Sequence, residues 1–108
     1  MNETAKPNLF TLVPFATEEV ISIKKAAEIA GKSERTLRNW CAEYGIGRRI
    51  AGGIWAVSRV ALAMLLDGNL DVLVCYRDHG ARGSWEPVAN YYRRVGLGAL
   101  LERPEFAL

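Results

Sequence analysis

The chain has few of the side chains on which metal sites, disulfide scaffolds and nucleophilic catalysis depend. Among its 108 residues there are two cysteines and one histidine. Cys41 and Cys75 lie 34 residues apart with no further ligand at metal-binding spacing, which excludes a disulfide framework and a cysteine-type zinc site. His79 stands alone, so no catalytic group of histidine with serine or cysteine can be assembled, and no phosphate-binding glycine loop occurs. We therefore expect no enzyme, no metal and no cofactor.

Long hydrophobic runs are absent as well. A membrane-spanning helix needs roughly 18 consecutive apolar residues, and no segment approaches that length. Residues 1–8 lack the positive start and apolar middle of an export signal. Half of the residues are hydrophobic and 24% are charged, which is typical of one soluble globular domain. We expect this domain in the cytoplasm and not at a membrane.

Positive charge is concentrated in one part of the chain, although the net charge is only +2. Residues 20–60 carry eight basic and three acidic side chains, a surplus of five positive charges. Residues 1–19 have a net charge of −2 and residues 61–108 a net charge of −1. A localised surplus of this kind is typical of a small module that binds a polyanion such as nucleic acid. A solvated basic face is the alternative, and charge alone does not separate the two.

The central segment has the pattern of two short helices joined by a tight turn. Ser22 predicts a capped helix over Ile23–Ala30, which Gly31 ends in the left-handed conformation that glycine tolerates. After a connection of three residues, the length found in a helix-turn-helix unit, Ser33 opens a second helix that runs to Tyr44. The apolar residues of this second helix form one stripe that we expect to be buried, namely Leu37, Trp40, Cys41 and Tyr44.

A glycine hairpin and a third helix follow. Two short β-prone runs flank Gly52 and Gly53, which supply the positive φ angles of a two-residue turn. Trp55 beside the turn is expected to pack on the core rather than to stack on bases. Ser58 then caps an apolar helix over Arg59–Leu66. This order of elements predicts a mainly α fold of the winged helix-turn-helix type, with a small β-hairpin wing and a short C-terminal helical extension.

The pattern is weaker outside the predicted DNA-binding domain, which covers residues 20–68. Prolines bracket an apolar run near the start, which predicts an extended N-terminal arm or edge strand within residues 1–19. Residues 69–108 form the C-terminal extension and tail, with helices expected over residues 70–77 and 86–95. Five apolar or aromatic side chains in these two segments either pack within the chain or form a self-association face: Phe10, Phe15, Trp85, Val88 and Tyr92.

The outer face of the second predicted helix has side chains suited to reading DNA. Arginine pairs with guanine O6 and N7, and asparagine pairs with adenine N6 and N7. Hydroxyl groups at a helix start donate to phosphate, and arginines in a wing contact the backbone or a narrow minor groove. Lysines nearby add phosphate contacts. The DNA-binding residues that we predict are Lys24, Lys25, Lys32, Ser33, Arg35, Thr36, Arg38, Asn39, Arg48 and Arg49.

A family resemblance agrees with this interpretation. It is carried by Ile23-Lys24-Lys25-Ala26-Ala27-Glu28-Ile29-Ala30-Gly31, by Ser33-Glu34-Arg35-Thr36-Leu37-Arg38-Asn39-Trp40, by Tyr44-Gly45-Ile46 with Arg48-Arg49, and by Gly52-Gly53. In these stretches residues 22–68 resemble the DNA-binding domain shared by MerR-type regulators and the excisionases of phages and integrative elements. The resemblance implies a winged helix that binds double-stranded DNA. MerR-type regulators continue into a long dimerisation coiled coil and an effector-binding segment, for which residues 69–108 are too short.

That departure favours an excisionase-type protein, a recombination directionality factor that binds and organises attachment-site DNA. The partners expected are double-stranded DNA, further copies assembling cooperatively on it, and an integrase, all on the nucleoid. A small phage or plasmid transcriptional regulator and a terminase small subunit are alternatives that use the same kind of domain. A protein-interaction adaptor on a winged-helix scaffold is the alternative of another class.

Overall fold

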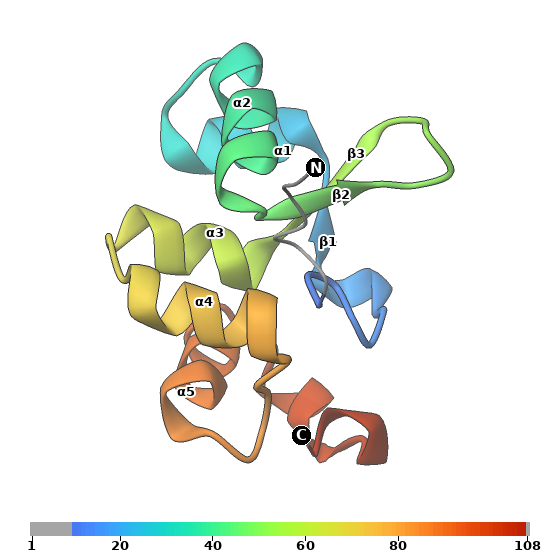
Figure 1. The fold of residues 1–108 in the computed structure, drawn as a ribbon, viewed down its shortest axis with the longest axis vertical. Coiled ribbons are helices and arrows are strands. Elements are labelled where there is room, and N and C mark those ends of the chain that lie inside the picture. Colours follow the sequence, from blue (N-terminus) through green and yellow to red (C-terminus); the bar gives the residue numbers. More distant parts are fainter. Residues whose placement is uncertain (1–9, 108) are drawn as a thin grey trace, which may run out of the picture.

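Helices dominate the structure, and a small sheet lies among them. The computed structural model describes residues 10–107, which form five α-helices and a three-stranded antiparallel sheet (Figure 1). This confirms the predicted mainly α fold with a small β component. Within the described residues no helix is long and apolar enough to cross a membrane. The elements are β1 (Val20–Ile21), α1 (Ile23–Ala30), α2 (Glu34–Tyr44), β2 (Gly47–Arg49), β3 (Trp55–Ser58), α3 (Arg59–Leu66), α4 (Leu70–His79) and α5 (Glu86–Arg94), with short 3-10 helices at Thr17–Glu19, Gly98–Glu102 and Pro104–Phe106.

The predicted caps define the first three helices. The hydroxyls of Ser22, Ser33 and Ser58 accept hydrogen bonds from backbone N–H groups three residues later, at the starts of α1, α2 and α3. Gly31, with a φ of 69°, ends α1 in the left-handed conformation, and Gly45 does the same for α2. The predicted bounds of these helices are confirmed, because each boundary depends on a hydrogen bond or a backbone angle within a few residues.

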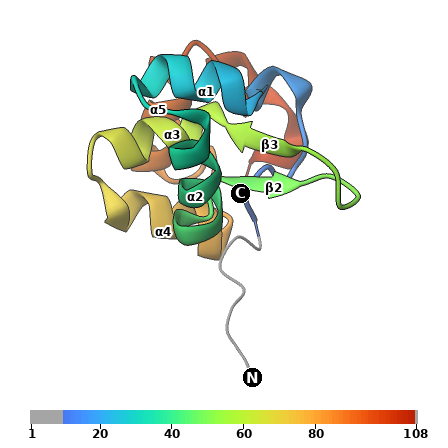
Figure 2. The ribbon, with the colours of Figure 1, turned by 90° about the horizontal axis from the view of Figure 1, so that it is seen from above.

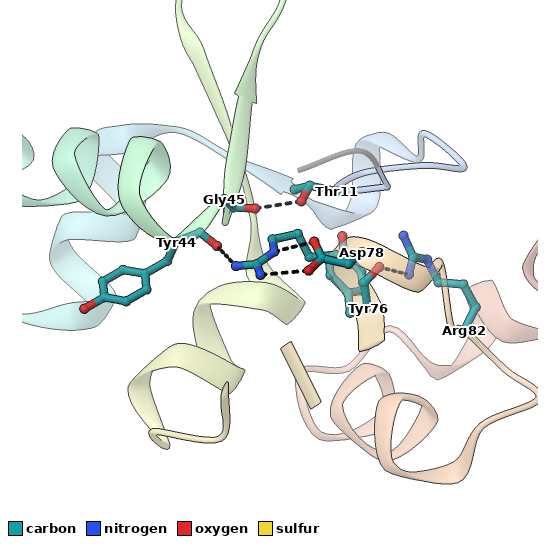
Figure 3. Close-up of polar contacts among 7 residues, drawn as sticks. Thr11, Tyr44, Gly45, Tyr76, Asp78 and Arg82 are labelled. Atoms are coloured by element: carbon teal, nitrogen blue, oxygen red, sulfur yellow. Dashed lines mark hydrogen bonds and ion pairs between the residues drawn. The ribbon is translucent and has the colours of Figure 1, made fainter. Parts of the chain in front are cut away.

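Residues 10–16, the described part of the predicted arm, fold against the rest of the protein. Residues 1–9 of the predicted arm lie outside the described residues. Beyond them, Leu12 is buried with a φ of 61°, and its N–H donates a hydrogen bond of 3.0 Å to the Tyr76 hydroxyl. Thr11 Oγ1 donates a hydrogen bond of 2.6 Å to the carbonyl oxygen of Gly45 (Figure 3). These partners are 34 and 64 residues away in the sequence, so no local pattern indicated them.

The edge strand that was expected in this segment begins later, at β1. β1 pairs antiparallel with β3, with Val20 opposite Ser58, and β3 pairs with β2 on its other side. The sheet order is therefore β1-β3-β2, with β1 and β2 at its edges. The β2–β3 hairpin projects away from the helices (Figure 2).

The hairpin turn differs from the two-residue Gly52-Gly53 turn that was predicted. Arg49 pairs with Trp55, and Gly53 N–H donates to the Ile50 carbonyl, so the connection is longer and its tight turn lies one residue earlier. Ala51 and Gly52 have the positive φ values, 53° and 74°. The pattern correctly indicated a glycine turn, but register decides which residues occupy its central positions.

Gly47 lies where no larger residue fits. A Cβ at this position would be 2.6 Å from the Ala56 carbonyl oxygen and 3.0 Å from Cys41 Sγ. We expect Gly47→Ala to destabilise the protein by about 1–3 kcal/mol, because the β3 backbone must move to admit a methyl group. Urea unfolding followed by tryptophan fluorescence measures the loss. Gly98→Ala is the control, since its Cβ would meet no atom closer than 3.4 Å; equal midpoints for the two variants would contradict this account.

The C-terminal helices complete the core and correct one part of the self-association prediction. Val88 and Tyr92 are fully buried, and the Tyr92 ring meets Phe106 edge-on at 6.0 Å between centroids. Their helical stripe is therefore internal packing, because α5 turns it toward the core instead of solvent. Phe10, Phe15 and Trp85 keep 37%, 56% and 38% of their surface exposed.

Candidate nucleic-acid interface

α2 presents a polar face to solvent, opposite the face that packs on the core. Leu37 and Cys41 are buried on the inner side. Arg35, Arg38 and Asn39 are all exposed on the outer side. Within the part of the chain that the structure describes, the side chains of Arg35 and Asn39 have no hydrogen-bond or ion-pair partner. The helix therefore carries three long hydrogen-bonding side chains on one accessible surface, as its 3.6-residue period predicted.

Acidic neighbours accompany some of the predicted basic residues. Arg38 Nη1 lies 3.8 Å from Glu34 Oε1, and Lys25 Nζ lies 4.0 Å from Glu28 Oε1. All four side chains are more than half exposed, and such exposed pairs contribute only about 0.2–1 kcal/mol each. Both cations can therefore exchange a carboxylate for a phosphate at small cost. Lys32, in the turn between α1 and α2, is exposed.

Ser33 and Thr36, the two hydroxyl residues at the start of α2, are hydrogen-bonded to each other. Ser33 Oγ accepts from the N–H of Thr36 and donates its own proton to Thr36 Oγ1 at 3.0 Å. Ser33 therefore acts here as the helix cap, and its hydroxyl shares an exposed hydrogen bond with that of Thr36. Both residues stay predicted phosphate donors.

A groove of about 590 Å³ runs between the start of α1, the outer face of α2 and the β2–β3 hairpin. Three of the predicted cations, Lys24, Arg38 and Arg49, line this groove. Glu34 is its acidic lining residue, and Ile54 and Trp55 form the hairpin side. Residues from three separate elements thus come together in one concave basic surface, which the sequence alone could not place.

The neighbouring arginines of β2 do not act on one surface. Successive side chains of a strand point to opposite faces, and only Arg49 lines the groove, while Arg48 is half-buried. Arg49 is held in place, because its Nε donates a hydrogen bond of 3.0 Å to the Gly53 carbonyl. Its guanidinium carbon also lies 5.7 Å from the centroid of the Trp55 ring. Trp55 is half-buried against the core, as predicted, and braces this cation.

The hairpin also exposes apolar side chains for which the sequence predicted no role. Ile54 is 84% exposed and Ile50 is 46% exposed. Together with Phe15, Val20 and Ile21 they line a second, apolar groove of about 580 Å³ beside the edge strand β1. A signal was present, since β-branched residues stand on both sides of a glycine turn, where polar residues are the rule.

Other reactive side chains are dispersed. Burial raises the pKa of the Cys41 thiol to about 12, so it is a protonated core residue at neutral pH. His79 is exposed at the end of α4. In residues 10–107, no three histidine, cysteine or acidic side chains come close enough together to hold a metal ion.

Comparison of the chain with models of protein families, with curated proteins and with solved structures finds no significant match. Any assignment of function therefore has to rest on the geometry and chemistry of the surface just described.

Proposed function

We propose that this protein binds double-stranded DNA through α2 and the β2–β3 hairpin, as a winged helix-turn-helix. The observation that carries the proposal is the basic groove, which is lined by residues of α1, of the outer face of α2 and of the outer half of the β2–β3 hairpin. A helix with arginine and asparagine on its free face fits the major groove, where those side chains pair with guanine and adenine. The hairpin would then reach the adjacent minor groove or backbone.

The roles within this surface follow from position and chemistry. Arg35 and Asn39, whose side chains have no partner among the described residues, are the base-reading candidates on α2. Arg38 can contact a base as well, once its exposed ion pair with Glu34 is broken. Lys24 and Arg49, on either wall of the groove, are placed for phosphates. Phosphate contacts set position and affinity, whereas base contacts set sequence preference.

An excisionase-type role is the finer part of the proposal. It is supported by the way α4 and α5 fold back into the same core as α2 and α3 and leave no long dimerisation helix among the described residues. A compact single unit of this kind suits a protein that assembles in several copies on attachment-site DNA. Genes next to its own, for an integrase, a promoter pair or a large terminase subunit, separate this role from a regulator or a packaging protein.

The first test of the proposal is the DNA affinity of substituted proteins. We expect Arg35→Ala to weaken binding to a duplex selected from a random pool by about 1–3 kcal/mol, roughly 5-fold to 150-fold, because a base contact is lost. Lys24→Ala is expected to reduce the slope of log K against log salt by about one, with little effect on sequence preference. Fluorescence anisotropy titrations at several salt concentrations measure both effects.

Arg93→Ala is the matched control, because it removes an equal charge from an exposed position on α5, at the other end of the molecule (Figure 1). If Arg93→Ala weakens DNA binding as much as Arg35→Ala, the protein attracts DNA only through its overall positive charge, and α2 is not the helix that contacts the bases. If no protein, including the wild type, prefers the selected duplex over random DNA, the proposal is wrong.

The apolar groove beside β1 favours a second candidate, a protein-interaction adaptor. Phe15 lines this groove and is exposed, so it is available to a protein partner, whereas Tyr92 is buried and is not. An adaptor would tolerate Arg35→Ala and Arg38→Ala and lose its partner on Phe15→Ala. The same set of variants therefore discriminates the two functions.

A further inference from the structure

The tip of the β2–β3 hairpin exposes two large apolar side chains, Ile50 and Ile54. Ile54, at 84%, is the most exposed of the large hydrophobic residues in the described chain. Ile50 stands across from it and is joined to it by a hydrogen bond of 3.3 Å from Ile50 N–H to the Ile54 carbonyl. An isoleucine with this exposure is unfavourable in water, and its burial on binding would be favourable.

The turn between the two isoleucines is thin. It consists of Ala51, Gly52 and Gly53, so no side chain larger than a methyl group projects from it. Its shape is tightly specified, since Ala51 and Gly52 both have positive φ and a Cβ on Gly53 would lie 3.2 Å from the Ile50 carbonyl oxygen. A narrow tip is what the minor groove, only about 6 Å wide, can admit.

The surroundings of the tip are cationic. The Arg49 side chain donates a hydrogen bond to the Gly53 carbonyl at the tip. Lys24 and Arg38 line the same groove as Ile54. A second copy of the chain docked symmetrically on this tip would bring equal charges together, which is unfavourable. A polyanion with an apolar interior complements both features at once. Duplex DNA has that composition, with phosphates outside and stacked bases inside.

We propose that the hairpin tip is a wedge, in which Ile54 enters the minor groove, separates a base step and kinks the duplex. The inference rests on the proposed DNA-binding function and adds a preferred form of DNA to it. Apolar side chains that enter between base pairs unstack them and bend DNA toward the major groove. Pyrimidine–purine steps such as TA unstack most easily, so the wedge prefers them. Arg49 and Lys24 hold the phosphates on either side of the opened step.

The experiment compares two synthetic duplexes of about 30 base pairs, one fully paired with a central TA step and one made flexible by an unpaired two-adenine bulge at that place. Donor and acceptor dyes at the duplex ends report bending. The wild type is expected to raise energy transfer on the paired duplex and to bind the bulged duplex about tenfold more tightly, since the bulge removes the cost of the kink.

Ile54→Ser is expected to abolish both the rise in transfer and the preference for the bulged duplex, while Ile54→Leu retains them. Leu70→Ser is the matched control, because Leu70 is an exposed apolar residue at the start of α4 that does not line the hairpin grooves. Circular dichroism of each variant confirms that the fold is kept.

The possible failures can be told apart. If the wild type binds both duplexes equally and without bending, the wedge is refuted and DNA binding stands. If it binds neither, the proposed function fails together with the wedge. If Ile54→Ser leaves bending intact and instead changes the mass of the protein in sedimentation experiments, the tip is an interface between copies, and the wedge is refuted.

Discussion

Replacement of Glu19 by alanine is expected to destabilise the fold by about 3–5 kcal/mol, because it removes the acceptor for three buried hydroxyl groups. Glu19 is fully buried, and its carboxylate accepts hydrogen bonds from Ser58 Oγ at 2.6 Å, Tyr76 at 2.5 Å and Tyr92 at 3.0 Å. These donors come from the start of α3, from α4 and from α5. Urea unfolding followed by circular dichroism measures the change in free energy.

Glu18→Ala is the matched control for this variant. Glu18 is the preceding residue of the same type, but its side chain is exposed and pairs only with Arg103 at the surface. We expect its removal to leave the unfolding midpoint nearly unchanged. A Glu19→Ala protein as stable as Glu18→Ala would show that the three hydroxyls find other partners and that the carboxylate does not join the helices.

Replacement of Arg82 by methionine is expected to lower the free energy of unfolding by about 3 kcal/mol and to loosen residues 10–16. The buried guanidinium donates to four backbone carbonyls, those of Phe10 and Val13 at 2.5 and 2.6 Å and those of Tyr76 and Ala81 at 3.0 and 2.7 Å. The Tyr76 bond appears in Figure 3. Methionine fills similar space but leaves all four carbonyls without this donor, two of them in the N-terminal segment.

Hydrogen exchange separates this effect from a general loss of stability. In Arg82→Met the amides of residues 10–16 are expected to exchange much faster, while those of α1 change only as far as global stability falls. Arg93→Met, at an exposed position on α5, is the control. Uniform acceleration along the chain in Arg82→Met would mean that Arg82 does not specifically hold residues 10–16.

Both of these side chains would be assigned to the surface from the sequence, because charged residues are rarely buried unless they are paired. Glu19 belongs to an acidic stretch and Arg82 to a glycine-rich one, and nothing in their neighbours indicates burial. Both contact Tyr76, whose hydroxyl donates a hydrogen bond to Glu19 and whose ring centroid lies 3.9 Å from the Arg82 guanidinium carbon. Partners 57 and 6 residues from Tyr76 cannot be inferred from periodicity.

Part of the candidate interface could also be predicted from the sequence, and part could not. The outer face of α2 was predictable, since the spacing of its apolar residues places Arg35, Arg38 and Asn39 opposite the core. The groove was not, because it also needs Lys24 from α1 and Arg49 from the hairpin. Alternation along β2 separates Arg48 from Arg49, but which of the two faces the groove depends on how β2 packs on β3.

Local chemistry in the sequence determined the helices: three serine caps and the left-handed glycines after α1 and α2 set their bounds through contacts within a few residues. The tertiary structure alone decided what those helices enclose. Contacts between distant residues pair β1 with β3 and join the Leu12 N–H to the Tyr76 hydroxyl. Such contacts also bury Val88, Tyr92, Glu19 and Arg82. Hydrophobic periodicity indicates which face of an element is buried, but the partner of that face is chosen by packing across the whole chain.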